Sequence, residues 1–160
     1  MITLQGAVLG DLVRHAAQEE ALGAAVGGTL ASGGMAEGDT IKVLIADDDA
    51  SVRAVLQGLV GGAEDLKLVG AADAAAGAAE LAREHQPHVA IVDWSMPGGG
   101  GPQAAKEIGD ASPGTRVIAL TASDSEHAAL DMLQAGAANV LVSDASMPEI
   151  AEAIRAAARG

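Results

Sequence analysis

The stretch that decides the fold is IKVLIADDD, residues 41–49, where an apolar run of strand length ends in three consecutive aspartates. Three more apolar runs also end in a carboxyl or hydroxyl group: HVAIVD (88–93), TRVIALT (115–121) and ANVLVS (138–143). Short apolar runs separated by stretches of helical length are typical of parallel strands in an α/β sheet. The sequence therefore predicts such a sheet.

Residues 41–160 predict five strands that alternate with five helices, which gives a parallel sheet covered on both faces and joined by right-handed crossovers. The short segment KLVGAA (67–72) suits an edge strand, whereas the runs of the third and fourth strands suit the sheet centre. This favours the flavodoxin-like strand order 2-1-3-4-5. The predicted strands lie near 41–46, 67–71, 88–93, 115–120 and 139–142, and the helices near 50–61, 73–85, 102–110, 124–135 and 146–158.

Residues 1–40 predict an N-terminal extension that ends in a Gly-rich linker, followed by a single domain over 41–160. Apolar residues between 8 and 30 have roughly helical spacing, but glycines interrupt them. Two interpretations stay open: a weakly ordered extension, or one helix that packs on the domain or on a second chain of a homodimer.

Composition excludes several classes of function. The formal net charge of −13 leaves no basic patch for nucleic acid and would be repelled by an acidic membrane surface. The chain has no cysteine, which excludes disulfides and thiol chemistry and fits the cytoplasm. The N-terminus is a poor signal peptide, and no apolar run reaches transmembrane length. We expect a cytoplasmic protein.

The predicted strand ends gather Asp47, Asp48, Asp93 and Thr121 at one edge of the sheet, where ligand sites of open α/β sheets lie. Asp49 is enough to cap the next helix, so the preceding pair is surplus to capping. Crowded carboxylates repel one another and call for a hard divalent cation such as Mg²⁺. One carboxylate can then act as a nucleophile toward a phosphoryl group.

Four stretches resemble the receiver domain (CheY-like) of two-component response regulators over residues 41–159. They are VLIADDDASVR, VAIVDWSMPGGGG, VIALTAS and the C-terminal AGAANVLVSDASMPEIAEAIRAAARG. The last stretch is similar to receivers that precede LuxR-type DNA-binding domains.

The resemblance implies that Asp93 is the phosphoacceptor and that Asp47, Asp48, Asp93 and the backbone carbonyl of Ser95 hold Mg²⁺. It also implies that the Thr121 hydroxyl bonds the phosphoryl oxygen. The phosphodonor would be a histidine kinase or phosphotransfer protein, and the downstream target a protein. Any enzymatic activity would be at most phosphoryl transfer to Asp93 and its slow hydrolysis.

Two positions depart from the family. Ser143 stands where the family has a lysine, which supplies positive charge to the phosphoryl group, and Val140 replaces the switch aromatic. None of the nine Lys and Arg residues is an obvious substitute in the sequence. We predict a phosphorylatable receiver with a degenerate switch, with a phosphorylation-independent binding module as the alternative. A phosphohydrolase of the haloacid dehalogenase type is disfavoured, because Ser95 stands where that class has a second acid.

Overall fold

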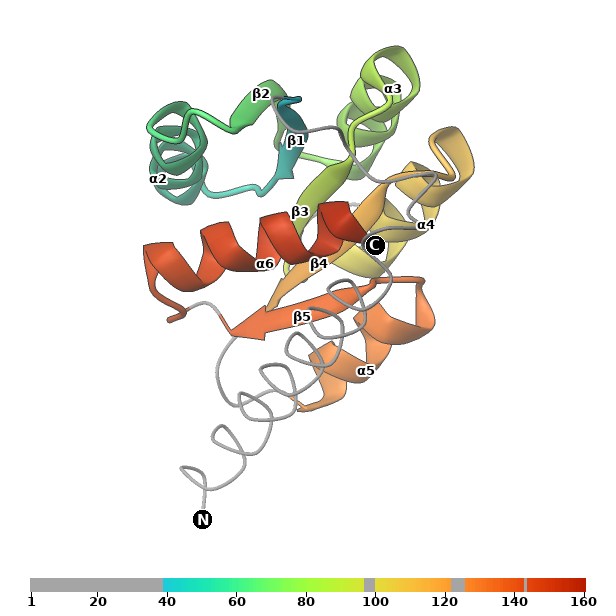
Figure 1. Ribbon diagram of the computed structural model, residues 1–160. Coiled ribbons are helices and arrows are strands. Elements are labelled where there is room, and N and C mark those ends of the chain that lie inside the picture. Colours follow the sequence, from blue (N-terminus) through green and yellow to red (C-terminus); the bar gives the residue numbers. More distant parts are fainter. Residues whose placement is uncertain (1–38, 97–99, 122–125, 143) are drawn as a thin grey trace.

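The computed structural model describes residues 39–96, 100–121, 126–142 and 144–160. Within these ranges five strands alternate with five helices (Figure 1). The strands are β1 (Ile41–Ala46), β2 (Leu66–Ala72), β3 (Val89–Asp93), β4 (Arg116–Thr121) and β5 (Asn139–Val142). The helices are α2 (Ala50–Gly61), α3 (Ala75–His85), α4 (Gly100–Ala111), α5 (Glu126–Gln134) and α6 (Met147–Arg159). The helix expected between residues 8 and 30 lies outside the described residues.

All strands are parallel and lie in the order β2-β1-β3-β4-β5, which confirms the predicted topology, including β2 as an edge strand. The register aligns the carboxyl ends of the strands. Asp93 of β3 lies opposite Leu120 of β4, and Thr121 lies opposite Val142 of β5. The polar groups that follow the strands therefore meet at one edge.

Helices cover both faces of the sheet, with α2 and α6 on one face and α3, α4 and α5 on the other (Figure 1). The alternation of side chains along β1 divides its apolar residues between the two cores. Leu44 packs with the α3–α5 side, whereas Val43 and Ile45 pack with α2 and α6. From Val43 to Ala46 each side chain faces one core or the other, which explains why VLIA is apolar throughout, whereas Lys42 near the start of the strand is only partly buried.

The core on the α3–α5 side consists largely of alanine. Ala78, Ala82 and Ala104 are fully buried there, beside larger residues such as Ile108 and Met132. A chain without Phe or Tyr has few bulky groups to place between helix and sheet. Small side chains let the helices approach the strands closely, so the interior is filled without aromatic residues.

Local signals placed most helix ends correctly. Asp49 caps α2 by accepting a hydrogen bond from the backbone N–H of Ser51 at 2.8 Å. Ser146 and Glu149 form a capping box at the start of α6. These caps satisfy backbone donors that the first helical turn would otherwise leave without partners.

The start of α4 differs from the prediction. The sequence predicted that the helix begins near residue 102, but Gly100 and Gly101 already belong to α4. A Cβ at Gly101 would lie 2.6 Å from the Cα of Trp94 and closer still to the carbonyl oxygen of Asp93. Glycine is therefore required so that this helix can start against the end of β3.

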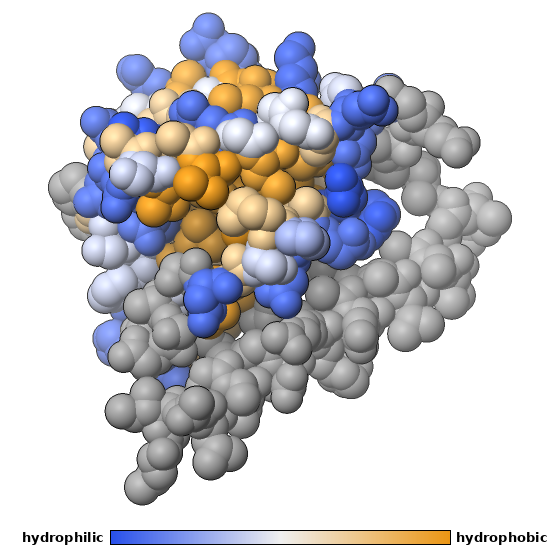
Figure 2. Space-filling model, turned by 90° about the vertical axis from the view of Figure 1, so that its left-hand side faces the viewer, coloured by the Kyte–Doolittle hydropathy of each residue, from blue (hydrophilic) through white to orange (hydrophobic). Residues whose placement is uncertain are grey.

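The surface is not uniformly polar. Figure 2 shows apolar side chains in orange reaching the surface between hydrophilic ones. The large apolar residues that are exposed in the described ranges are Val55, Leu130, Leu133 and Met147. Among the described helices, none combines the length and apolarity that a bilayer crossing requires.

Candidate functional site

The first part of the site is the turn between β1 and α2. The backbone N–H of Asp47 donates to the carbonyl of Ala72 in β2, which fixes the turn to the sheet. One Asp47 carboxylate oxygen accepts the backbone N–H of Asp49 at 2.9 Å. Asp47 is buried, at 4% exposure, whereas Asp48 is exposed. Burial raises the pKa of the Asp47 carboxyl, and the charges of Asp48 and Asp49 raise it further.

Asp93 forms the second part of the site, at the end of β3. The strand continues its pairing one residue further, since the Trp94 N–H donates to the carbonyl of Leu120 at 2.9 Å. The Asp93 carboxyl is partly buried between the sheet and the β1–α2 turn, and its pKa is raised to about 6. Desolvation is the main cause, followed by repulsion from Asp47 and Asp48. Backbone N–H groups of Ser95 and Trp94 offset part of this effect.

Asp47, Asp48 and Asp93 form one cluster. One carboxylate oxygen from each residue lies within 4.8 Å of the other two. Three hard oxygen donors at this spacing suit a magnesium ion, which accepts carboxylates and keeps positions for water or a phosphoryl oxygen. The donor set therefore fits the cation, and the sequence prediction that these three residues lie together is confirmed.

Thr121 ends β4 at the same edge of the sheet. Its side chain is only 1% exposed, and its hydroxyl has no hydrogen-bond partner among the described residues. A buried hydroxyl without a partner costs free energy, about 1–3 kcal/mol. Structure alone does not account for this cost, whereas an oxygen-rich ligand at the strand edge would satisfy the hydroxyl.

The sequence also singled out Ser95, Ser143 and Val140. Ser95 lies two residues after Asp93 in the sequence, and its side chain is exposed. Ser143 lies outside the described residues. Val140 is buried in β5, at 3% exposure, and packs in the core beneath α3–α5. No aromatic side chain therefore stands at this position of the strand.

Arg53 is the base that folding brings to the site, although the sequence placed it in a helix at least one turn away. Its Nη1 donates to the backbone carbonyl of Asp47 at 2.7 Å. Its charge lowers the pKa of Asp47 and partly offsets the burial of that carboxyl. The sequence did hold a signal for this contact. Arg53 lies in the first turn of α2, and from there a long side chain can reach back to the turn that precedes the helix.

Comparison with known proteins agrees with this arrangement. The family model for the response regulator receiver domain matches residues 43–155, and the chain belongs to that family. The chain is thus a receiver domain of the two-component signalling type, with the CheY-like, flavodoxin-like fold. The signal receiver domain of NarL from Mycobacterium tuberculosis is similar in structure, with a TM-score of 0.72 at 33% identity. That match covers 76% of this chain and 98% of the other.

Two curated relatives show how far the likeness extends. A transcriptional regulatory protein of Bacillus subtilis, YxjL, is 36% identical over 122 residues, which is 76% of this chain and 56% of the relative. The response regulator GacA of Pseudomonas aeruginosa is 35% identical over 115 residues, which is 72% of this chain and 54% of the relative. The chain spans about half the length of the curated relatives it matches, and the likeness covers the receiver region.

Proposed function

We propose that Asp93 accepts a phosphoryl group from a histidine kinase or phosphotransfer protein, and that the modified domain controls a protein–protein interaction. The observation that carries this proposal is the cluster of Asp47, Asp48 and Asp93, with oxygens within 4.8 Å of one another at the carboxyl edge of the sheet. Charged groups with perturbed pKa values at such an edge are typical of functional sites.

In the proposed reaction a carboxylate oxygen of Asp93 attacks the phosphorus of a phosphohistidine. The new O–P bond forms as the P–N bond breaks, and the imidazole leaves with the electron pair and takes up a proton from water. Mg²⁺, when bound, withdraws charge from the phosphoryl oxygens. Asp47, Asp48, Asp93 and the Ser95 carbonyl would hold this ion.

The chain's own residues have separate tasks in this proposal. The backbone N–H groups of Trp94 and Ser95 orient the Asp93 carboxylate. The Thr121 hydroxyl, which lacks a partner in the described structure, donates to a phosphoryl oxygen. Arg53 holds the turn that carries Asp47 through its hydrogen bond to the Asp47 carbonyl. Ser143 would contribute at most a neutral hydrogen bond where the family lysine carries a charge.

We also propose how the chain is divided into domains and where in the cell it is located. We place an N-terminal extension and linker over residues 1–40 and the receiver domain over 41–160, which the start of β1 at Ile41 supports. A cytoplasmic location follows from a phosphodonor of the histidine kinase type.

Intact-mass measurement after incubation with Mg²⁺ and acetyl phosphate tests the proposal. We expect the gain of one phosphoryl group, which is lost in Asp93→Asn. Asp49→Asn is the matched control, because it removes a neighbouring carboxylate outside the cluster and asparagine still caps α2. If the parent gains no phosphoryl group from either acetyl phosphate or a phosphohistidine donor, the phosphorylation-independent module is the better account.

A further inference from the structure

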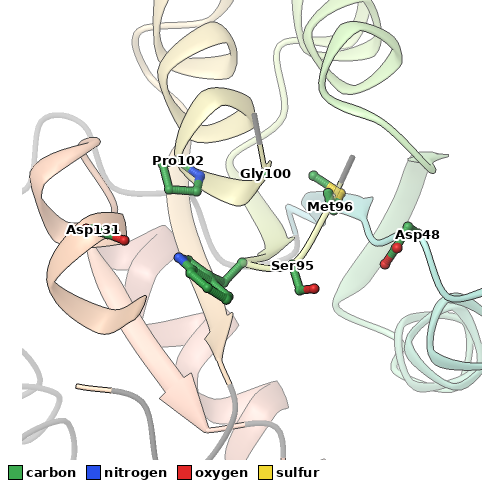
Figure 3. A pocket seen from close by; sticks show the side chains of 7 residues that line it. Asp48, Ser95, Met96, Gly100, Pro102 and Asp131 are labelled. Carbon is green, nitrogen blue, oxygen red and sulfur yellow. The ribbon is translucent and has the colours of Figure 1, made fainter. Parts of the chain in front are cut away.

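A pocket of about 550 Å³ opens beside the carboxylate cluster, between the segment that follows β3 and helices α4 and α5. Figure 3 shows Asp131 of α5 at one side of the pocket and Asp48 at the other, with Ser95 and Met96 between them. The volume lies in the range of pockets that hold small ligands or a few side chains. Asp131 and the walls around it are not part of the metal site.

The lining of this pocket is acidic, and one polar atom of its wall lacks a partner in the described ranges. Both charged residues that line it, Asp48 and Asp131, are acidic. The indole nitrogen of Trp94 is buried and has no hydrogen-bond partner in the described ranges. An indole N–H can only donate, so it needs an acceptor. Because this nitrogen is closed off from the pocket surface, an occupant cannot supply that acceptor, and the acidic lining selects an occupant by its positive charge.

The nearby bases do not meet these needs. Neither Lys nor Arg is among the described residues that line the pocket. Arg53 donates to the Asp47 carbonyl and lines a different pocket, beside Asp73 and Glu80. His127 approaches Asp131 at 3.6 Å, but its side chain is 87% exposed and it is not among the described residues that line the pocket.

We propose that this pocket binds a basic, extended segment of the downstream protein partner. An Arg or Lys side chain of that segment pairs with Asp131, in the pocket whose wall includes Trp94. The aliphatic stem of such a side chain packs on the apolar lining, which includes Met96 and Pro102. The net charge of −13 favours the approach of a basic partner.

The regulatory part of this inference rests on the proposed phosphorylation of Asp93. When Mg²⁺ is already bound, a phosphoryl group adds negative charge next to Asp48, so it strengthens the attraction of the pocket for a cation relative to the Mg²⁺-bound, unmodified domain. The reciprocal also holds, because binding of the basic segment must favour the phosphorylated form by the same factor. The partner thereby supplies, from outside, a positive charge at an acidic edge where Arg53 is already engaged with the Asp47 carbonyl.

The probe for the test is an N-acetylated, C-amidated Gly-Arg-Gly-Arg-Gly peptide, compared with the same peptide carrying citrulline, which is neutral, in place of arginine. The readout is the indole N–H signal in ¹H–¹⁵N NMR, which is unambiguous because the chain has one Trp. We expect the arginine peptide to move this signal and to bind about fivefold tighter or more than the citrulline peptide, with the difference shrinking at high salt.

Variants separate the pocket from the general acidity of the protein. Asp131→Asn should weaken arginine-peptide binding about two- to fivefold, whereas Asp131→Glu retains it. Asp110→Asn is the matched control, since it removes an exposed carboxylate near the other end of α4. Equal binding of the two peptides, or equal effects of Asp131→Asn and Asp110→Asn, would overturn the proposal. So would spermidine binding as tightly as the peptide with no movement of the indole signal.

A final arm distinguishes this inference from the proposed function. Beryllofluoride with Mg²⁺ mimics the phosphoryl group, and we expect it to tighten arginine-peptide binding several-fold relative to the same concentration of Mg²⁺ alone. If the mimic binds and peptide affinity stays constant, the coupling is refuted. If the mimic fails to bind while the arginine peptide still binds through Asp131, the phosphorylation proposal fails and the pocket assignment stands.

Discussion

The substitution Asp93→Asn tests whether the carboxylate cluster is held together at a cost in stability. Asn keeps the shape of the side chain but removes the charge. In the metal-free protein this relieves the repulsion between Asp93 and its neighbours Asp47 and Asp48, which is one cause of the raised pKa of Asp93. We therefore expect the variant to be more stable than the parent at neutral pH.

The size of the effect follows from the pKa. It is about 6 for Asp93 in the folded protein against an ordinary value of 3.8. A difference of one in pKa corresponds to about 1.4 kcal/mol, so ionised Asp93 costs the folded state about 3 kcal/mol. Because the folded pKa is the higher one, protonated Asp93 stabilises the fold below pH 3.8, and this contribution is lost as the pH rises to about 6. The advantage of Asp93→Asn should therefore be small near pH 4 and reach its full size above pH 6.

Urea denaturation of parent and variant in the presence of a chelator measures this difference, at about pH 4.5 and about pH 7.5. Asp110→Asn provides the control, since it removes an exposed carboxylate of α4 and should change the free energy of unfolding by less than about 0.5 kcal/mol at either pH. The reasoning is refuted if Asp93→Asn is less stable than the parent at the higher pH, or if its advantage does not depend on pH.

Three further predictions concern the same edge. If Mg²⁺ binds with a dissociation constant of about 1 mM, about 10 mM Mg²⁺ should raise the free energy of unfolding by about 1.4 kcal/mol, and Asp93→Asn should abolish most of this gain in thermal melts. Gly101→Ala should destabilise the fold by about 1–3 kcal/mol, because its Cβ would overlap the backbone of Asp93 and Trp94. Gly109→Ala in the same helix meets nothing within 4 Å and should stabilise by up to about 1 kcal/mol in the same urea assay. Thr121→Val should leave the metal-free protein as stable or more stable, since it removes a hydroxyl without a partner, yet it should weaken beryllofluoride binding about fivefold in Trp94 fluorescence titrations.

The fold could be predicted from the sequence because its signals are local and repeated. The runs Val43–Ala46 and Val89–Val92 are apolar at every position, as a strand buried on both faces requires. Topology followed from the weak edge strand and from the handedness of crossovers. The start of α4 could not be predicted, because the reason for its glycines is the backbone of Asp93 and Trp94, which only folding brings against Gly101.

The proximity of the three carboxylates could be predicted from the sequence, whereas the energetics of the cluster depend on the folded structure. Strand order alone places Asp47, Asp48 and Asp93 together. The burial that raises the pKa of Asp93 depends on how the turn after β1 packs against the end of β3, which periodicity does not encode. The hydrogen bond from Arg53 to the Asp47 carbonyl depends on the conformation of the arginine side chain. The sequence showed only that the two residues are close along the chain.

A contrast within the chain argues that the cluster exists for a ligand and not for stability. Asp65 shows what a structural carboxylate looks like here: Arg155 donates to it at 2.7 and 3.1 Å, and its pKa falls. Asp93 faces like charges, and its pKa rises to about 6. The unpartnered hydroxyl of Thr121 ends the neighbouring strand at the same edge, and Gly101, which Ala cannot replace without overlap, packs against Asp93. The starts of α2 and α6 have ordinary helix caps. By contrast, like charges, an unpartnered hydroxyl and a required glycine are found together at this one edge of the sheet. This distribution is expected when a binding site is maintained at a cost in stability.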